Sequence, residues 1–569
     1  MRAALFVRSV GMTIIAVFVA LVAPVAFDTA ALGQRVTGAL AEPAAQQGWP
    51  TYGFDLANSR RVGSSQISAD NVRLLRPVWI YLEELHGRDE TSPLVIGDTM
   101  YVTTGSMSGT SQTVAALDVR TGARKWTFRP TLGYFRPYYG IVNRGVAAEN
   151  GRIFFATMDG RLFALDARSG AKIWQVQVGD PHVGFTESMA PLAWRGMVFI
   201  GGSSHEYGIR GSFTAYRASD GARLWRWWSV GPGWEGRYTA SVHGVSLHRN
   251  IAREKAEAPR HRTSWMRGGG PVWMTPALDQ KLGIIYLGTG NPNLDSESRP
   301  GDNLYTDSIV ALDAATGKMR WNYQETPHDV WDDDVASPPM LFDARDASGK
   351  LVPAVGEAGK TGWFYVLNRI NGNLIRVSEP LVPRHDPYGT PDLEGAIGPA
   401  SYDPVTRQAF ALVERPVVQP SDYLTDNYLS AVAVDSGRLA WRQQLTSGGR
   451  IMGGVLTAGN LVFAAAPLGT FYAFDASSGK QVWRYQFGED DGFGVVPALP
   501  WTTRAREWLT SVKRGIFREP FTQLASAYSD APPISYVVDG RQMIAIAVDL
   551  FPWRTGIGGD AIVTFALPR

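Results

Sequence analysis

The chain has 569 residues, and its 55 Lys and Arg nearly balance its 53 Asp and Glu, which leaves a net charge of +2. This balance, without a run of basic residues, argues against nucleic-acid binding. The chain has no cysteine, which excludes disulfides, thiolate metal sites, a cysteine nucleophile and a covalently attached c-type haem. With 61 glycines, 35 prolines and 11% aromatic residues, the composition favours an all-β protein with many turns.

The N-terminal segment has the pattern of a secretory signal. Two arginines lie within Met1–Arg8, Val10–Phe27 is almost wholly apolar, and Ala39-Leu-Ala41 is a small-residue cleavage pattern. We therefore expect residues 1–41 to be a signal peptide and the mature protein to be periplasmic. The apolar stretch has 18 residues, which is near the minimum for spanning a membrane, so an uncleaved N-terminal anchor stays open as the alternative.

A repeat is the strongest pattern in the chain. Ala116-Leu-Asp-Val-Arg-Thr-Gly-Ala-Arg-Lys-Trp126 recurs in full copies that end at Trp174, Trp321 and Trp483, and in weaker copies that end at Trp225 and Trp441. Each intact copy places Trp four residues after Gly, and one further copy, with Gly372, lacks the Trp. The Asp-x-x-Thr-Gly step predicts a turn between two strands.

The period of this repeat predicts a β-propeller of about eight blades formed by residues 42–569 as a single domain. The 96 residues between Gly221 and Gly317 are about twice the 48 between Gly122 and Gly170, so we expect one blade there to have lost its motif. We expect the repeated Trp side chains to pack between neighbouring blades, which is a structural role.

Two stretches interrupt the repeat. Ser246–Thr263 is polar and partly compatible with a helix, and is expected to form a loop over one face. Thr502–Phe517 places Trp508, Leu509 and Val512 at a helical period, which predicts a helical insertion around 502–517. A helix that caps the propeller is the first interpretation, and a partner-docking or membrane-surface element is the alternative.

An acidic stretch near the middle of the chain, Thr326–Val335, holds Asp332, Asp333 and Asp334 in succession. In an extended segment alternate side chains share a face, so Asp332 and Asp334 are expected to point into one cavity while Asp333 points away. Two converging carboxylates repel unless a cation or a shared proton lies between them. A solvated acidic loop is the other interpretation of such a triplet.

Further motifs surround this stretch: Glu206-Tyr-Gly-Ile-Arg-Gly211, Gly268-Gly-Gly-Pro-Val-Trp273, Gly288-Thr-Gly-Asn291-Pro, His328-Asp-Val-Trp-Asp332 and Gly359-Lys360-Thr-Gly-Trp. In this order they resemble the pyrroloquinoline quinone (PQQ) dependent alcohol dehydrogenases, eight-bladed quinoproteins related to methanol dehydrogenase. The similarity runs from about Trp49 to Pro568. The repeat itself resembles the tryptophan-docking motif of that family.

The resemblance implies a metal site in which oxygen donors hold Ca²⁺ or a lanthanide ion. The family's metal ligands match Glu206, Asn291 and Asp332. Asp334 matches the additional Asp of the lanthanide-type methanol dehydrogenases. Because some calcium-dependent sugar quinoproteins share that Asp, the identity of the ion stays open.

The resemblance also implies a PQQ site. Trp273 matches the indole beneath the cofactor ring, Arg144 a cation that meets a PQQ carboxylate, and Lys360 a cation beside the quinone oxygens. The remaining implied cofactor contacts are Glu90, Ser188, Ser203, Ser204, His205 and Trp553. One departure is Tyr138-Tyr139, which stands where the family has a vicinal disulfide and would either cover or obstruct PQQ.

By this resemblance, the protein oxidises an alcohol, or a related polyol or aldehyde, by hydride transfer to metal-bound PQQ. Asp332 would be the general base and Lys360 would stabilise charge on the quinone oxygens. Without a haem of its own, the chain needs a separate cytochrome c or quinone as electron acceptor, and a homodimer is left open. The alternatives are a sugar or cyclic polyol quinoprotein dehydrogenase and a non-catalytic propeller that serves as an assembly scaffold.

Overall fold

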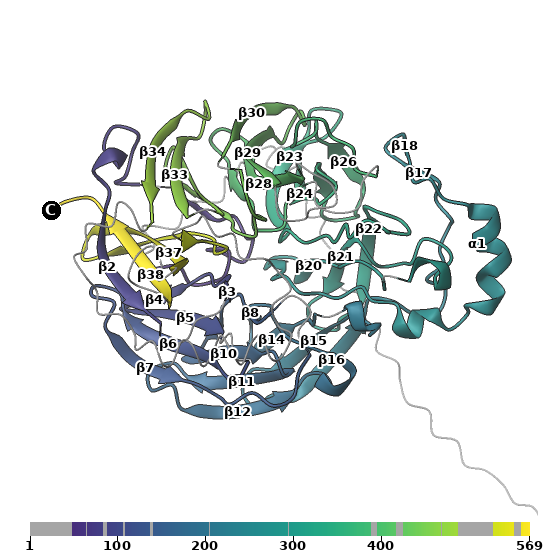
Figure 1. The fold of residues 1–569 in the computed structure, drawn as a ribbon, viewed down its shortest axis with the longest axis horizontal. Helices are drawn as coiled ribbons and strands as arrows, with labels where there is room; N and C mark the ends of the chain where they lie inside the picture. Colours follow the sequence, from purple (N-terminus) through teal and green to yellow (C-terminus); the bar gives the residue numbers. More distant parts are fainter. Residues whose placement is uncertain are drawn as a thin grey trace, which may run out of the picture. The chain divides into compact units, whose positions relative to one another are not determined.

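Eight antiparallel sheets, arranged as the blades of a propeller, form the framework of this computed structural model (Figure 1). The structure describes residues 48–63, 65–83, 88–105, 109–136, 140–203, 205–293, 295–388, 395–416, 425–445, 447–467, 469–487, 527–550 and 559–569. All of these belong to one unit of the chain, Ala45–Arg569. The expected signal peptide, the expected helical insertion, Tyr138-Tyr139, Ser204 and Trp553 lie outside these ranges, as does the side chain of His205.

Blades 1 to 4 follow one another along the chain, each with four strands paired in sequence order. Blade 1 holds β4 (Leu94–Ile96), β5 (Thr99–Gly105), β6 (Gln112–Asp118) and β7 (Arg124–Phe128). Blade 2 holds β9 (Ala147–Glu149), β10 (Arg152–Thr157), β11 (Arg161–Asp166) and β12 (Lys172–Gln177). Blade 3 holds β13 (Leu192–Trp194), β14 (Met197–Ile200), β15 (Ser212–Arg217) and β16 (Arg223–Trp228). Blade 4 holds β19 (Ala277–Asp279), β20 (Ile284–Gly288), β21 (Ser308–Asp313) and β22 (Met319–Gln324).

Blades 5 to 7 repeat this order. Blade 5 holds β23 (Met340–Arg345), β24 (Leu351–Ala358), β25 (Phe364–Asn368) and β26 (Leu374–Val377). Blade 6 holds β27 (Ser401–Asp403), β28 (Gln408–Pro416), β29 (Thr425–Ala433) and β30 (Leu439–Gln444). Blade 7 holds β31 (Val455–Ala458), β32 (Leu461–Ala466), β33 (Thr470–Asp475) and β34 (Gln481–Gln486), and β1 (Arg61–Val62) joins β31 in parallel. A parallel pair of short strands, β3 (Arg88–Asp89) and β8 (Val142–Asn143), links the loops that precede blades 1 and 2.

Blade 8 closes the ring by combining both ends of the described chain. β36 (Ile534–Val538), β37 (Arg541–Leu550) and β38 (Gly559–Ala566) come from the C-terminal part, with β35 (Ala527–Tyr528) at an edge. The outer strand is β2 (Arg76–Leu82), which pairs antiparallel with β38. Because β2, from the N-terminal part of the described chain, hydrogen-bonds to the last strand, β38, this ladder closes the ring.

The strands owe their stability to burial between neighbouring blades. The middle strands are apolar on both faces, and every residue of β32, Leu-Val-Phe-Ala-Ala-Ala, is buried. The outer strand β12 instead alternates exposed and partly buried positions, because only one of its faces meets a neighbouring blade. Within the described residues, no helix has the length and apolar character needed to cross a membrane.

The expected blade between Gly221 and Gly317 does not exist, so that prediction is wrong. Blade 3 ends with β16 and blade 4 begins with β19, and the residues between them form an insertion. The insertion contains β17 (Ser241–Val242), β18 (Val245–Ser246), α1 (Ile251–Glu257), and 3-10 turns at Ala258–Arg260 and Ser264–Arg267. Figure 1 shows α1 at the edge of the ring, beyond β22. The blade without the repeat motif is blade 8.

The repeated Trp side chains pack between blades, as predicted. A Cβ added to Gly170 of blade 2 would lie 2.5 Å from Cε3 of Trp126 in blade 1, and the Trp126 indole donates to the Ala167 carbonyl oxygen at 3.1 Å. The same pairing recurs for Trp79 on Gly122, Trp174 on Gly221, Trp225 on Gly317, Trp321 on Gly372 and Trp441 on Gly479. In the copy without Trp, the stem of Arg376 packs on Gly437 and its guanidinium donates to the Val434 carbonyl oxygen.

Gly170→Ala should therefore destabilise the protein more than Gly151→Ala does. Both glycines have positive φ, +71° and +74°, so both substitutions carry the same backbone strain. Gly151 has nothing within 4 Å of the added Cβ, whereas Gly170 meets the Trp126 ring. We expect an additional loss of about 1–3 kcal/mol for Gly170→Ala, measured by urea unfolding. Equal losses would show that the indole does not contribute to packing at this turn.

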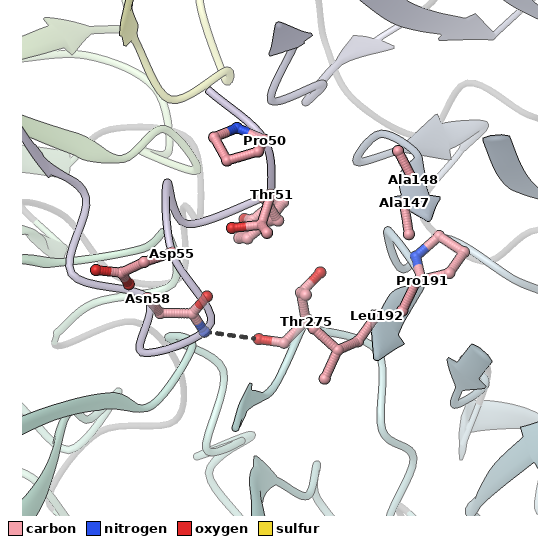
Figure 2. Close-up of a pocket in the computed structure, with 11 residues that line it drawn as sticks. Pro50, Thr51, Asp55, Asn58, Ala147, Ala148, Pro191, Leu192 and Thr275 are labelled. Carbon is pink, nitrogen blue, oxygen red and sulfur yellow. Dashed lines mark hydrogen bonds between the residues drawn. The ribbon is translucent and has the colours of Figure 1, made fainter. Parts of the chain in front are cut away.

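The centre of the ring is filled by the N-terminal segment, residues 49–62. Asn58 donates to the carbonyl oxygens of Thr275 and Pro339, in blades 4 and 5. The fully buried Arg60 donates to those of Val455 and Pro533, in blades 7 and 8. Figure 2 shows the pocket left between this segment and the inner strands of blades 2 and 3, with the Asn58–Thr275 hydrogen bond at its edge. The segment thus ties the loops that precede the inner strands.

Candidate functional site

The predicted site residues lie in two kinds of loop that open at the same end of the blades. Strands alternate in direction, so the loop before a first strand and the loop between a second and a third strand share one end. The first kind carries Glu90, Arg144, Ser188, Trp273, Asp332 and Asp334. The second kind carries Ser203, Glu206, Asn291 and Lys360. The fold therefore gathers residues from blades 1 to 5 at one end of the ring.

Lys360 is the centre of the acidic half of the site. Its ammonium donates to Asp334 Oδ2 at 2.7 Å and to the Asp332 carbonyl oxygen at 2.8 Å, and it lies 3.4 Å from Asp332 Oδ1. Burial by itself lowers the pKa of Lys360, but the carboxylates of Asp332 and Asp334 outweigh it and raise that pKa above its ordinary value. Lys360 is therefore a permanent cation held between the two carboxylates.

The acidic stretch is shaped by its own side chains. The Asp329 carboxylate accepts from the backbone N–H groups of Trp331 and Asp333, at 2.7 and 2.9 Å. Asp332 has a φ of +68°, a left-handed conformation that Asp adopts more readily than most residues. Asp333 accepts from Thr326 Oγ1 at 3.2 Å. As predicted, Asp332 and Asp334 face one site while Asp333 points away from it. The reason differs from the prediction, because the segment is not a regular extended strand and Asp332 is left-handed.

The two carboxylates that contact Lys360 differ in their exposure to solvent. The Asp334 side chain is 5% exposed, whereas the Asp332 side chain is 17% exposed. Asp334 is also anchored by the backbone N–H of Asn291 at 2.8 Å and lies 3.4 Å from the Trp273 indole nitrogen. A molecule that enters from solvent therefore reaches Asp332 first.

Asn291 joins this cluster through its amide. Its Nδ2 donates to Asp332 Oδ1 at 2.7 Å, and its Oδ1 is a buried acceptor without a hydrogen-bond partner among the described residues. A buried acceptor of this kind is costly unless a donor or a cation completes it. Together with the carboxylates of Asp332 and Asp334, it provides the hard oxygen donors that suit Ca²⁺ or a trivalent ion, so these residues fit the metal that the sequence predicts.

The other half of the site contains Arg144. Its guanidinium lies 2.5 Å from Glu90 Oε2 and donates to Ser188 Oγ at 2.7 Å, and Ser188 Oγ is 2.8 Å from Ser203 Oγ. The guanidinium carbon also lies 4.8 Å from the centre of the Trp273 ring. Arg144 thus joins four predicted cofactor contacts into one buried to half-buried group and covers the indole that was predicted to face PQQ.

Glu206 lies in the 3-10 turn His205–Tyr207, and backbone pairing places its segment beside the others. Gly202 bridges Val272, next to Trp273, and Gly269 bridges Pro292, next to Asn291. Among the described residues, no three Asp, Glu or His side chains are close enough together to hold an ion. The predicted set of three carboxylates is therefore not assembled as a group, and Asn291, Asp332 and Asp334 are the part of it that meets.

Two features of the site were not anticipated from the sequence. Glu414 of β28 accepts from the Ile451 N–H at 2.7 Å and lies 3.6 Å from the guanidinium nitrogen of Arg450. Glu325, just after β22, and Glu357 of β24 are both fully buried, and the two carboxyl groups interact with each other beside the Lys360 loop. The only sequence signal for Arg450 is its place just before a first strand, where the other blades carry site residues.

The Glu325–Glu357 pair predicts a loss of stability at high pH. Burial raises the pKa of Glu357 to about 8, well above the value of 4.5 in an unfolded chain. The folded state therefore keeps a proton that the unfolded state releases, so the stabilisation is complete below pH 4.5 and is lost as the pH rises toward 8. Glu357→Gln should flatten the fall in unfolding free energy between pH 5 and 8, measured by urea titration. An unchanged slope would contradict a proton held on Glu357 in the folded state.

Comparisons with known proteins agree with this arrangement. A family model described as glucose/ethanol/alcohol dehydrogenase, β-propeller domain, matches residues 49–393, and one described as outer membrane protein assembly factor BamB matches residues 425–513. The quinohemoprotein alcohol dehydrogenase of Comamonas testosteroni is 32% identical over 92% of this chain and 76% of its own length. Its crystal structure superposes with a TM-score of 0.70 at 28% identity, over 93% and 82% of the two chains.

A lanthanide-dependent methanol dehydrogenase of Methylorubrum extorquens is 34% identical over 58% of this chain and 54% of its own length. The first family model covers more than half of the chain, and its range contains all the loops of blades 1 to 5 that carry the described site residues. The chain therefore belongs to the PQQ-type glucose/ethanol/alcohol dehydrogenase β-propeller family.

Proposed function

We propose that this protein oxidises an alcohol, or a related polyol or aldehyde, with PQQ and a bound cation in the site around Lys360. The observation that carries the proposal is the junction of Asp332, Asp334 and Asn291, with the Trp273 indole beside it. When bound, PQQ accepts the electron pair of the substrate and the cation makes its carbonyl more electrophilic. Asn291, Asp332, Asp334 and Glu206 are the residues that would hold the cation.

The roles of the protein side chains follow from their exposure and charge. Asp332 is the carboxylate that solvent reaches, so it is proposed as the base that takes the hydroxyl proton of the substrate. Lys360 is buried and cationic, so it is proposed to stabilise negative charge that develops next to it. Arg144, held by Glu90 and Ser188, is proposed to bind a carboxylate of the cofactor once it leaves the face of Trp273.

The acceptor and the location are part of the same proposal. The chain has no cysteine to attach a haem, so electrons are proposed to pass to a separate cytochrome c or to a quinone. The secretory pattern of residues 1–41 supports a periplasmic location. The similarity to a lanthanide-dependent enzyme and the presence of Asp334 support a lanthanide ion over Ca²⁺.

Reconstitution tests this function directly. Purified protein is mixed with PQQ and either Ca²⁺ or La³⁺, desalted, and assayed for retained cofactor by absorbance and for dye reduction with alcohols, aldehydes, sugars and cyclic polyols. The expected result is stoichiometric PQQ and dye reduction with at least one alcohol. Retained PQQ with activity on sugars alone would assign the sugar dehydrogenase alternative.

A non-catalytic scaffold is the second candidate, because residues 425–513 match the BamB model. Under that alternative no PQQ is retained with either ion and no substrate reduces the dye. The described site supports the first candidate, because the carboxylates of Asp332 and Asp334 and the buried Asn291 Oδ1 fit a bound cation.

A further inference from the structure

A buried segment that was not predicted from the sequence, residues 299–303, belongs to the same β20–β21 loop as Asn291 and contacts the loop that carries Asp332. Arg299 is 2% exposed, and its Nε donates to the Asn293 carbonyl oxygen at 2.6 Å. Another of its nitrogens donates to the Asp329 carbonyl oxygen, and a third donates to Asn303 Oδ1 at 2.7 Å. One side chain thus holds the Asn291 loop and the Asp332 loop at a fixed separation.

The same loop joins these elements to the insertion between blades 3 and 4. The Gly301 N–H donates to Glu254 Oε2 of α1 at 3.0 Å, and its carbonyl oxygen accepts from His328 Nδ1 at 2.9 Å. Arg249 of the insertion binds both Glu254 and Asp302, at 2.6 and 2.7 Å. The insertion therefore braces residues 299–303 next to the acidic stretch, since Glu254 Oε2 also lies 3.7 Å from His328 Nδ1.

Charge adds to this geometry. Arg299 is a fully enclosed guanidinium whose acidic neighbours include Asp329 and Asp307, and burial lowers its pKa to about 10, which leaves it charged at neutral pH. A buried cation next to the acidic stretch offsets part of the repulsion between the carboxylates that would face a metal. Replacing it would release the two loops, whereas the loss of its positive charge by itself would favour a bound cation, so weaker cation binding after replacement reports the lost positioning.

We propose that Arg299 is a positioning residue that sets the distance between Asn291 and the Asp332–Asp334 pair, and thereby the affinity of the site for its cation. This inference rests on the proposed function, because it assigns a role toward the cation that the function requires. The three hydrogen bonds of Arg299 end on Asn293, Asn303 and Asp329, and not on the proposed ligands themselves. Its effect on turnover is exerted through the ligands that it holds.

The test compares three variants by calorimetric titration of La³⁺ and of Ca²⁺ into metal-free protein loaded with PQQ. Arg299→Met removes all three hydrogen bonds, and Arg299→Lys keeps the charge and at most one of them. Arg253→Met is the matched control, since Arg253 is 62% exposed and pairs with Glu297 at the surface. We expect Arg299→Met to weaken La³⁺ binding at least tenfold, Arg299→Lys less, and Arg253→Met not at all.

A second readout separates positioning from general stability. Saturating La³⁺ should restore most of the turnover of Arg299→Met with an unchanged KM for the alcohol, because the ligands themselves are intact. Wild-type affinity in folded Arg299→Met would overturn the inference. If that variant does not fold, wild-type affinity in Arg299→Lys would overturn it instead. Wild-type protein that binds neither ion would defeat the proposed function and the inference with it, whereas binding that is equal in all variants defeats the inference alone.

Discussion

Asp332→Asn is expected to retain PQQ and the cation but to lower kcat by about 10²–10⁴, because an amide cannot take the hydroxyl proton of the substrate. The substitution suits the site. Asn tolerates the left-handed backbone at position 332, where φ is +68°, and its side-chain oxygen can still accept from Asn291 Nδ2. The loop should therefore stay intact, and metal analysis of the variant separates loss of the base from loss of the cation that Asp332 would also help to hold. Steady-state kinetics measure the fall in kcat, and absorbance measures the PQQ that the variant retains.

The matched control is Asp333→Asn. Asp333 belongs to the same triplet but is buried and faces Thr326, and burial with the nearby Asp329 carboxylate raises its pKa well above the ordinary value. A protonated carboxyl and an amide are similar in shape and charge, so we expect this variant to keep near wild-type kcat. If Asp332→Asn turned over at the wild-type rate, or if both variants lost the same activity, the assignment of Asp332 as base would be wrong.

Asp334→Ala is expected to abolish lanthanide-supported activity, by more than 10²-fold, and to affect calcium-supported activity much less. A trivalent ion needs more negative charge from its ligands than Ca²⁺ does, and Asp334 supplies the additional carboxylate. The structure adds a cost that applies with either ion. Asp334 accepts from Lys360 and from the Asn291 backbone, so its loss leaves a buried cation with Asp332 alone.

We expect that cost to appear as a loss of roughly 3 kcal/mol in the unfolding free energy of the metal-free variant. Activity is measured with La³⁺ and with Ca²⁺ on the same preparation, and stability by urea unfolding. Asp334→Asn provides the comparison, because it keeps an oxygen for the Asn291 N–H while removing the charge. Equal losses of activity with both ions would show that Asp334 serves the structure of the site rather than the choice of ion.

The repeat was predictable because its chemistry is local. The Asp-x-x-Thr-Gly turn and the Trp four residues later lie within eleven residues. Each copy therefore predicts a pair of strands and a contact with the next blade. Blade 8 lacks this motif and takes its outer strand, β2, from residues 76–82. The sequence therefore indicated the number of blades correctly while assigning the missing motif to the wrong place, between Gly221 and Gly317.

The candidate site was partly predictable. The motifs indicated that Asn291, Asp332, Asp334 and Trp273 belong together, and the structure brings them together. They did not indicate that Lys360 holds both carboxylates, or that Arg144 rests against Trp273. These pairings join different blades, and no spacing in the sequence encodes the distance between loops that lie far apart along the chain.

The sequence by itself determined that this chain forms a ring of blades, because turn residues and alternating apolar strands act over a few neighbouring residues. It also determined the chemical types present at the site. Only the tertiary structure decided which carboxylate meets solvent, which cation compensates the pair, and that Arg299 fixes the spacing of their loops. Exposure and charge compensation depend on every element that surrounds a group, and in a closed ring those elements come from both ends of the chain.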